Sequence, residues 1–321
     1  MKNRYLFTIA KILIAGFTVW FLYQELMKRN AIEQWESVRT TLSSTYSFTI
    51  IIGVFCLMIL NWVSESYKWK ILLEKVSSIS LGSAINGVFA GITFSLFTPN
   101  RLGEPAGRLL FLPSIARKPS VLAMSVGAIS QMIITYSLGL IGLIYFNQLI
   151  KRNLGFNFPL LIAFLISIVL FVMLLYLNLG KVSKIISSIS LFKKHSELLK
   201  VYEKYGKVDL LTVFFIALLR YSIYSFQYVL LIHMFLPELA LLKIASIVPV
   251  LFMAQSIIPS FALTDLGIRG SMAVYFFGYI TNQSLAVISA AFLLWFINII
   301  IPSLIGCFFI LRLNYSRVST T

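Results

Sequence analysis

Six charged side chains lie within or beside apolar stretches of this 321-residue chain. Four are arginines and two are acids: Arg101, Glu104, Arg108, Arg220, Asp265 and Arg269. Arginine can grip a phosphate group through two parallel hydrogen bonds. If all six side chains share one cavity, four bases against two acids leave a surplus of positive charge. Such a cavity would favour an anion.

Two segments, 98–108 and 259–269, hold five of these charges around a proline and a glycine. In each segment an acid precedes an arginine by four residues, which places both on one face of a helix in the more favourable order. Matching breaks in two apolar stretches indicate an internal repeat with a binding site between its halves. The ion pairs could equally cap helix ends. The residues expected at the turns are Pro99, Gly103, Pro259 and Gly267.

The composition places these charges in a membrane protein. Hydrophobic residues make up 59% of the chain and charged residues only 12%, against about 25% charged in soluble domains. This composition excludes soluble enzyme folds and disulfide scaffolds as the main architecture. We expect an all-α polytopic protein with about six crossing helices, at 5–26, 47–64, 120–147, 158–179, 209–235 and 284–311.

Two further apolar stretches, 80–98 and 241–258, end in the proline-containing segments described above. We expect each to turn back as a re-entrant helical hairpin, over 80–118 and 241–282. The alternative is a pair of short helices that crosses the membrane twice. Both alternatives leave the following helices in the same orientation, so charge counting does not separate them.

Basic residues set the expected orientation. The loop 180–208 holds seven lysines, so the positive-inside rule places it in the cytoplasm. One hairpin then enters from each side, as in an inverted repeat. We expect one transmembrane domain over 1–321, with halves of about 1–157 and 158–321, in the cytoplasmic membrane with both termini inside. The other segments expected on the cytoplasmic side are 1–4, 65–79, 99–119 and 312–321.

The loop 180–208 is also amphipathic, because isoleucine, leucine, phenylalanine and tyrosine are interspersed among its lysines. It could lie in the membrane interface against anionic headgroups. It could also be a solvated basic loop with two short helices. The sequence leaves both interpretations open.

Other chemistry has little support in the sequence. His195 and His233 are isolated from each other in the sequence, and Cys56 and Cys307 lie in apolar runs, so we expect no metal and no cofactor. The net charge of +16 arises mostly in short loops between apolar runs, which is typical of lipid contact rather than nucleic-acid binding. No nucleophile elbow, P-loop or paired-carboxylate motif indicates a catalytic site.

The first proline segment and the residues before it resemble a known family. The run T-P-x-R-x-G-E-x-x-x-R over 98–108, preceded by WKILL at 69–73 and by Ala90-Gly91, is similar to lysylphosphatidylglycerol synthase transmembrane regions. These are also called flippase-like integral membrane proteins, and the similarity in layout extends over nearly the whole chain.

The second segment matches the family less closely. Pro259 and the run Gly267-Ile268-Arg269 match, but Gly270 stands where the family has glutamate. Asp265 stands where the family usually has glycine.

The resemblance implies a role in lipid translocation. Full-length relatives aminoacylate phosphatidylglycerol in a soluble domain and move the product lipid to the outer leaflet through the membrane part. This sequence reaches only ten residues past its last expected helix, so we expect the translocation role and no enzyme activity.

The expected cargo is an anionic or aminoacylated phospholipid, bound by the six charged residues. The expected partners are anionic lipid headgroups, together with a second copy of the chain or a separate lipid-modifying enzyme. Two alternatives remain at this stage. One is a secondary transporter of a small anion, and the other is an accessory or enzyme subunit acting on lipid-linked glycans.

Overall fold

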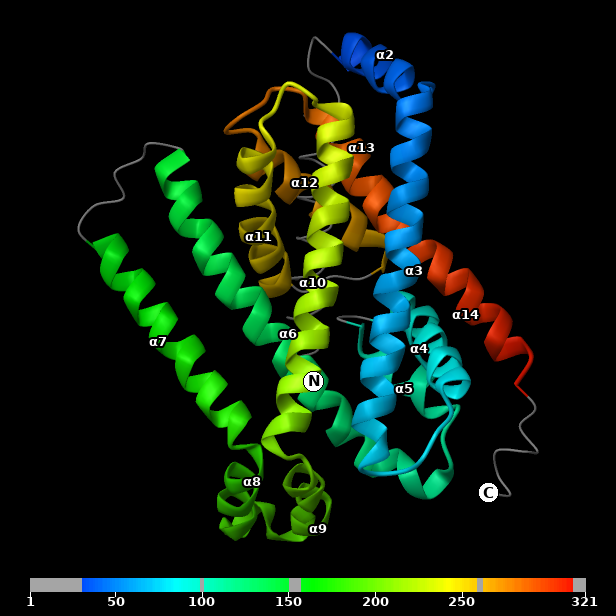
Figure 1. Cartoon of the computed structure of the whole chain (residues 1–321), viewed down its shortest axis with the longest axis vertical. Helices are drawn as coiled ribbons and strands as arrows, with labels where there is room; N and C mark the ends of the chain where they lie inside the picture. The colour runs from blue at the N-terminus through cyan, green and yellow to red at the C-terminus, as the bar shows by residue number, and fades with distance from the viewer. Residues whose placement is uncertain (1–30, 99–100, 150–156, 259–261, 314–321) are drawn as a thin grey trace, which may run out of the picture.

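The computed structural model describes residues 31–98, 101–149, 157–258 and 262–313, and these ranges contain helices and no strands (Figure 1). The predicted all-α class is confirmed. The helix expected at 5–26 lies outside the described residues, and so do the turn residues Pro99 and Pro259.

Within the described residues, five long apolar helices have the length and composition to cross a membrane. The shortest has 21 residues, which at 1.5 Å per residue matches a hydrocarbon core of roughly 30 Å. Large apolar side chains are exposed along them, as expected where lipid replaces water. The five are α3 (Thr45–Glu74), α6 (Ser114–Leu149), α7 (Asn157–Leu177), α10 (Lys207–Phe235), and the continuous run of α13 (Ser284–Trp295), η4 (Phe296–Ile300) and α14 (Ile301–Leu311).

Helix α3 is longer than the span expected at 47–64 and continues into the segment 65–79, which was expected on the cytoplasmic side. The helix continues to Glu74, and Glu65, Lys68 and Trp69 are buried within it. The positive-inside rule counts each lysine as solvated. Here Lys68 and Glu65 form an ion pair one turn apart inside the protein, so neither marks the membrane surface.

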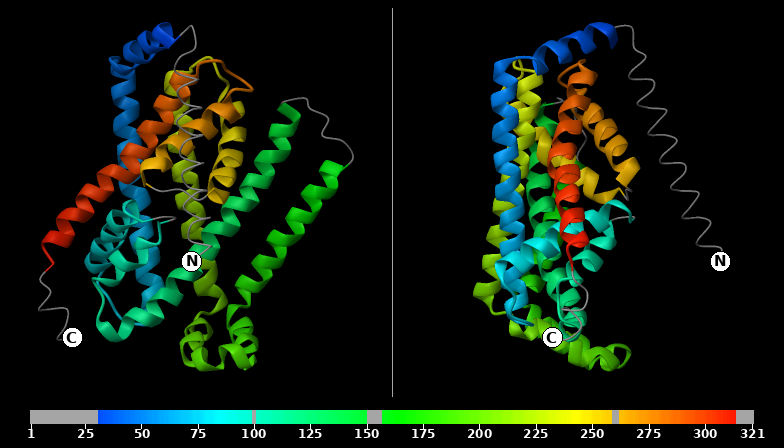
Figure 2. Two further views of the ribbon diagram at one scale, coloured as in Figure 1. Left: turned by 180° about the vertical axis from the view of Figure 1, so that it is seen from behind. Right: turned by 90° about the vertical axis from the view of Figure 1, so that its right-hand side faces the viewer.

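Two pairs of short helices point toward each other from opposite ends of the molecule (Figures 1 and 2). One pair is α4 (Leu81–Leu96) with α5 (Gly103–Leu109), and the other is α11 (Leu241–Ile257) with α12 (Ala262–Phe277). In each pair the first helix ends near the middle of the molecule, and the second runs back toward the end from which the first came. With 16 and 17 residues, α4 and α11 are too short to cross a roughly 30 Å core. This geometry is that of hairpins rather than double crossings.

Glycines bring α4 and α5 into backbone contact. A Cβ on Gly91 would lie 2.9 Å from the carbonyl oxygen of Glu104, and one on Gly107 would collide with the carbonyl oxygen of Ala90. At the turn, the backbone N–H of Gly103 donates to Thr98 Oγ1 at 2.7 Å. Small residues at such contacts are a common means of packing helices in membranes.

Short helices occupy both ends of the bundle. At one end lies α2 (Ala31–Leu42). At the other, between α7 and α10, lie α8 (Leu179–Ser188), η2 (Ser190–His195), α9 (Ser196–Leu199) and η3 (Lys200–Lys204). The segment 180–208 is therefore a folded helical unit.

Replacing Gly107 with alanine should loosen the first hairpin. The new Cβ meets the α4 backbone, which cannot move aside as a flexible side chain would, so we expect a loss of about 1–3 kcal/mol in stability. The measurement is the thermal unfolding midpoint in detergent. Gly53→Ala is the matched control, because a Cβ on Gly53 has no neighbour within 4 Å. Equal midpoints for the two variants would contradict the tight α4–α5 contact.

Candidate functional site

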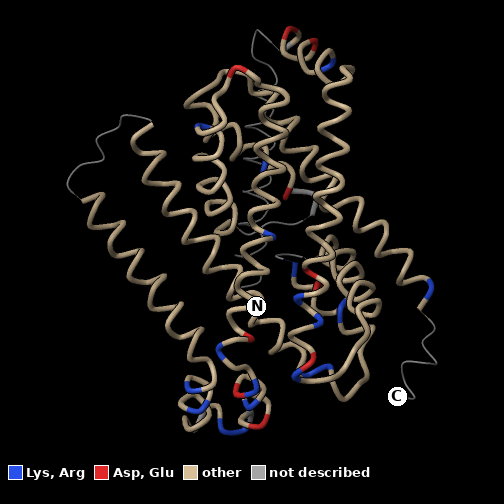
Figure 3. The backbone as a smooth tube through the Cα atoms, viewed as in Figure 1, with Lys and Arg blue, Asp and Glu red and all other residues tan. Residues whose placement is uncertain are grey.

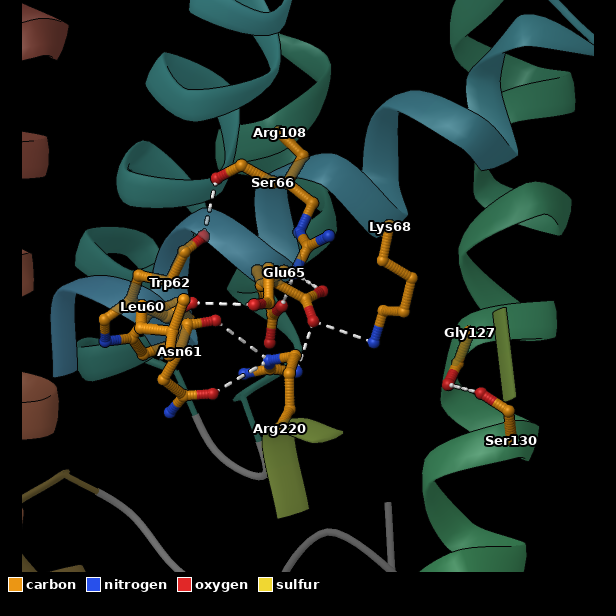
Figure 4. Close-up of polar contacts among 12 residues, drawn as sticks. Leu60, Asn61, Trp62, Glu65, Ser66, Lys68, Arg108, Gly127, Ser130 and Arg220 are labelled. Carbon is orange, nitrogen blue, oxygen red and sulfur yellow. Dashed lines mark hydrogen bonds and ion pairs between the residues drawn. The ribbon is translucent and has the colours of Figure 1, made fainter. Parts of the chain in front are cut away.

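A buried carboxylate, that of Glu65 on α3, gathers three basic side chains (Figure 4). Lys68 Nζ lies 2.7 Å from Glu65 Oε2, and Arg108 Nη2 lies 2.8 Å from Oε1. Arg220 on α10 pairs with the same carboxylate through its Nη1 atom. Glu65 therefore joins the first hairpin to two long helices through charge-assisted hydrogen bonds.

Both arginines of this cluster are fixed by further contacts. The guanidinium of Arg108 also pairs with Glu104, and it lies over the Trp69 ring at 5.4 Å from the centroid. Arg220 lies over the Trp62 ring at the same distance, and its Nε donates to Asn61 Oδ1 at 3.0 Å. Cation–π contact and hydrogen bonding together hold each guanidinium in one orientation.

A second ion pair forms in the opposite hairpin. On α12, Arg269 Nε donates to Asp265 Oδ2 at 2.8 Å. Arg269 Nη1 reaches Tyr224 on α10 and Gln255 on α11, at 3.4 Å each. The pairing expected from the four-residue spacing is thus present in both hairpins. In each case the pair also contacts other helices, so it does more than cap a helix end.

A cavity of about 290 Å³ lies between the two hairpins, and three arginines line it: Arg101, Arg220 and Arg269. Arg101 follows the turn of the first hairpin with a φ of 57°, a left-handed conformation that is rare for arginine. The amide oxygens of Gln131 and Asn298, which also line the cavity, have no hydrogen-bond partner among the described residues. Both oxygens are themselves buried, so the polar groups that the cavity offers to a ligand are mainly its three arginines.

The hypothesis that all six charged residues share one cavity needs correction. Only Arg101, Arg220 and Arg269 line it. Glu104 and Arg108 belong to the Glu65 cluster, which reaches the cavity through Arg220. Asp265 is buried and pairs with Arg269.

Of the predicted turn residues that the structure describes, Gly103 lies where α5 begins after the turn, and Gly267 lies inside α12, one turn beyond its start.

Sequence reasoning missed Glu65 and Lys68, because it ended the expected span 47–64 ten residues before the end of α3 at Glu74. Both are buried charges. Together with the six predicted residues they make five bases and three acids, so the expected positive surplus stays at two. The feature of the sequence that could have indicated this ion pair is the three-residue spacing of an acid and a base just after an apolar run.

A π-helical turn, η4, was also missed. Within it, the carbonyl of Asn298 accepts a hydrogen bond from Trp62 Nε1 at 3.2 Å. A π-turn exposes backbone groups that an α-helix would use internally, and such turns are frequent at functional sites. Here it fixes the Trp62 ring against which Arg220 lies.

The fold and the site define a class: a polytopic helical membrane protein with a charged cavity between two opposed hairpins. Residues 8–306 match the family described as the lysylphosphatidylglycerol synthase TM region. This match covers nearly the whole chain, and the chain therefore belongs to that family. No curated protein matches the sequence.

Replacing Glu65 with glutamine should destabilise the fold strongly. The buried Lys68 and Arg108 and the partly buried Arg220 would lose their shared counter-charge, and breaking a buried pair by removing one partner costs about 3–5 kcal/mol. Glu74→Gln is the control on the same helix, because the Lys70–Glu74 pair is solvent-exposed and such pairs contribute about 0–1 kcal/mol. Thermal unfolding in detergent compares the two variants. Similar midpoints would mean that Glu65 does not organise the cluster.

Proposed function

We propose that this protein binds an anionic phospholipid headgroup in the cavity between its hairpins and carries it between membrane leaflets. The observation that carries the proposal is the convergence of Arg101, Arg220 and Arg269 on one cavity inside an apolar helical bundle. A charge at membrane depth is costly unless it is paired or solvated. Family membership supports a role in lipid handling.

The three arginines differ in how far they are already neutralised. Arg220 pairs with Glu65 and Arg269 with Asp265, whereas Arg101 is exposed and has no ion-pair partner among the described residues. A phosphodiester carries one negative charge. The five bases and three acids of the site have a net charge of +2, which can balance it. Arg101 would make the first contact, and the paired arginines would complete the phosphate site.

Exchange of ion-pair partners offers a means of switching access. A headgroup phosphate competes with Glu65 for Arg220, and with Asp265 for Arg269. Occupancy would therefore loosen the contact of α10 with α3, and of Arg269 with its own helix. The two hairpins enter from opposite ends of the molecule. Movement of one hairpin would therefore open the cavity toward one side of the membrane, and movement of the other would open it toward the opposite side.

The remaining parts of the proposal concern placement and partners. We place the protein in the cytoplasmic membrane with its basic segment 180–208 and both termini on the cytoplasmic side. The protein would act as a carrier and not as an enzyme. A second copy of the chain or a separate lipid-modifying enzyme would be its protein partner.

A small-anion transporter is the second candidate, favoured by one observation. A cavity of about 290 Å³ holds a headgroup or a small organic anion but no acyl chains. The two candidates differ in the route, because a lipid needs an opening toward the bilayer and a solute needs a sealed path to water.

Lipids that co-purify with the protein test the proposed cargo. We expect enrichment of one anionic headgroup class over bulk membrane, and a reduction of about tenfold in Arg101→Gln, because one charge-assisted bidentate contact is lost. Mass spectrometry of extracted lipids gives both numbers. Arg39→Gln, on exposed α2 at one end of the molecule, is the matched control. A lipid profile equal to bulk membrane, with uptake of a small anion into proteoliposomes, would favour the second candidate.

A further inference from the structure

The helical unit over 179–207 concentrates positive charge at one end of the molecule (Figure 3). We call this unit the basic cap. It holds seven lysines and two acids, Glu197 and Glu203. Those acids pair with Lys200 at 2.6 Å and with Lys184 at 3.9 Å. The other five lysines have no ion-pair partner within the described residues: Lys181, Lys193, Lys194, Lys204 and Lys207.

Large apolar side chains lie among these lysines and are exposed. Ile185, Ile189 and Phe192 are 66%, 47% and 41% exposed, next to Lys184, Lys193 and Lys194. Ser183 points the other way, into the cap, where its hydroxyl donates to the Leu199 carbonyl at 2.7 Å. Two residues along a helix correspond to a rotation of about 200°, so Ile185 faces away from the interior of the cap.

The cap is docked firmly on the bundle, which fixes this outward face. Tyr205 donates to the Leu72 carbonyl at 2.7 Å, and the hydroxyls of Tyr202 and Ser125 lie 2.8 Å apart. These contacts join the cap to α3 and α6. The exposed apolar residues are therefore not free to turn inward.

Chain connectivity holds the cap at one bilayer surface. Helix α7 has the highest mean hydropathy of the five long helices, 3.1, and it is largely exposed. It ends at Leu177, and α8 begins two residues later at Leu179. At its other end, the cap leads directly into α10, which returns through the bundle. Both ends of the cap are therefore joined to helices that are long and apolar enough to cross a membrane.

We propose that the basic cap binds an anionic lipid surface, with Ile185, Ile189 and Phe192 inserted among the headgroups and the unpaired lysines against phosphates. A helix that lies in the membrane interface requires exposed apolar side chains with lysines near them, and the cap has both. The excess of lysine selects anionic over zwitterionic lipid. A soluble acidic protein would match the charge but would not explain why the apolar groups lie at the end of α7. This site is separate from the cavity.

Site-directed spin labelling tests the proposal on the full chain in nanodiscs. Cys56 and Cys307, both free and exposed, are first replaced with serine. Ile185→Cys and Phe192→Cys then each carry a nitroxide, whose collisions with water-soluble nickel chelate and membrane-soluble oxygen are measured. In bilayers with about a third anionic lipid we expect nickel access to fall by about threefold or more relative to phosphatidylcholine bilayers.

Neutralising the charge should reverse this fall. In Lys193→Gln/Lys194→Gln we expect nickel access at the Ile185 label to return toward its phosphatidylcholine value, whereas the charge-preserving control Lys193→Arg/Lys194→Arg should keep the label protected. Equal nickel access in both bilayers would overturn the proposal and make the cap a solvated unit. Protection from both reagents in every bilayer would also overturn it, because a protein partner would then cover the face.

Discussion

The buried Glu65 carboxylate shares its two oxygens among three cations that come from three different helices, and two of these cations are buried as well. Without this carboxylate, removing each cation from water into the low-dielectric interior would carry a large free-energy penalty. Because one acid serves three bases, the positions of α3, α5 and α10 depend on each other. Arg220 is the side chain that carries this constraint into the cavity, where Asn61 and Trp62 hold its guanidinium in place.

Close helix packing supplies the second constraint. Arg108 can reach Glu65 only because α5 lies directly against α4, and that approach depends on Gly91 and Gly107. The same principle applies where Gly306 of α14 meets the Phe89 carbonyl of α4. Small residues thus place a short, charged helix deep in the bundle, while long apolar helices face lipid around it. The packing of the helices therefore positions the charged residues, and they are not isolated charges placed at random in an apolar bundle.

Local patterns in the sequence were enough to predict the class of fold and part of the site. Long apolar runs predicted the crossing helices, and prolines in shorter runs predicted the two hairpins. The four-residue spacing predicted the pairs that Glu104 and Asp265 form with their arginines. Each of these features depends on neighbours in the chain, which is why periodicity and spacing reveal them.

Such local patterns could not predict contacts between residues that are far apart in the sequence. Glu65 and Arg220 are 155 residues apart, and nothing local indicates that they meet. Burial of Lys68 could not be foreseen either, because a lysine near the end of an apolar run usually marks the membrane surface. The π-turn at Asn298 contacts Trp62, which is far away in the sequence. Which arginines line the cavity is a property of the assembled bundle.

The central claim, that the cavity carries lipid headgroups across the membrane, is tested most directly in proteoliposomes. Phosphatidylglycerol with a fluorophore on its acyl chain is placed in both leaflets, and dithionite bleaches the label that reaches the outer leaflet. We expect parent protein and Arg39→Gln to expose the inner pool at least about tenfold faster than protein-free vesicles, and Arg101→Gln to lose most of this rate. An inner pool that stays protected with parent protein, or an Arg101→Gln rate equal to that of the parent, would show that the cavity does not carry lipid headgroups.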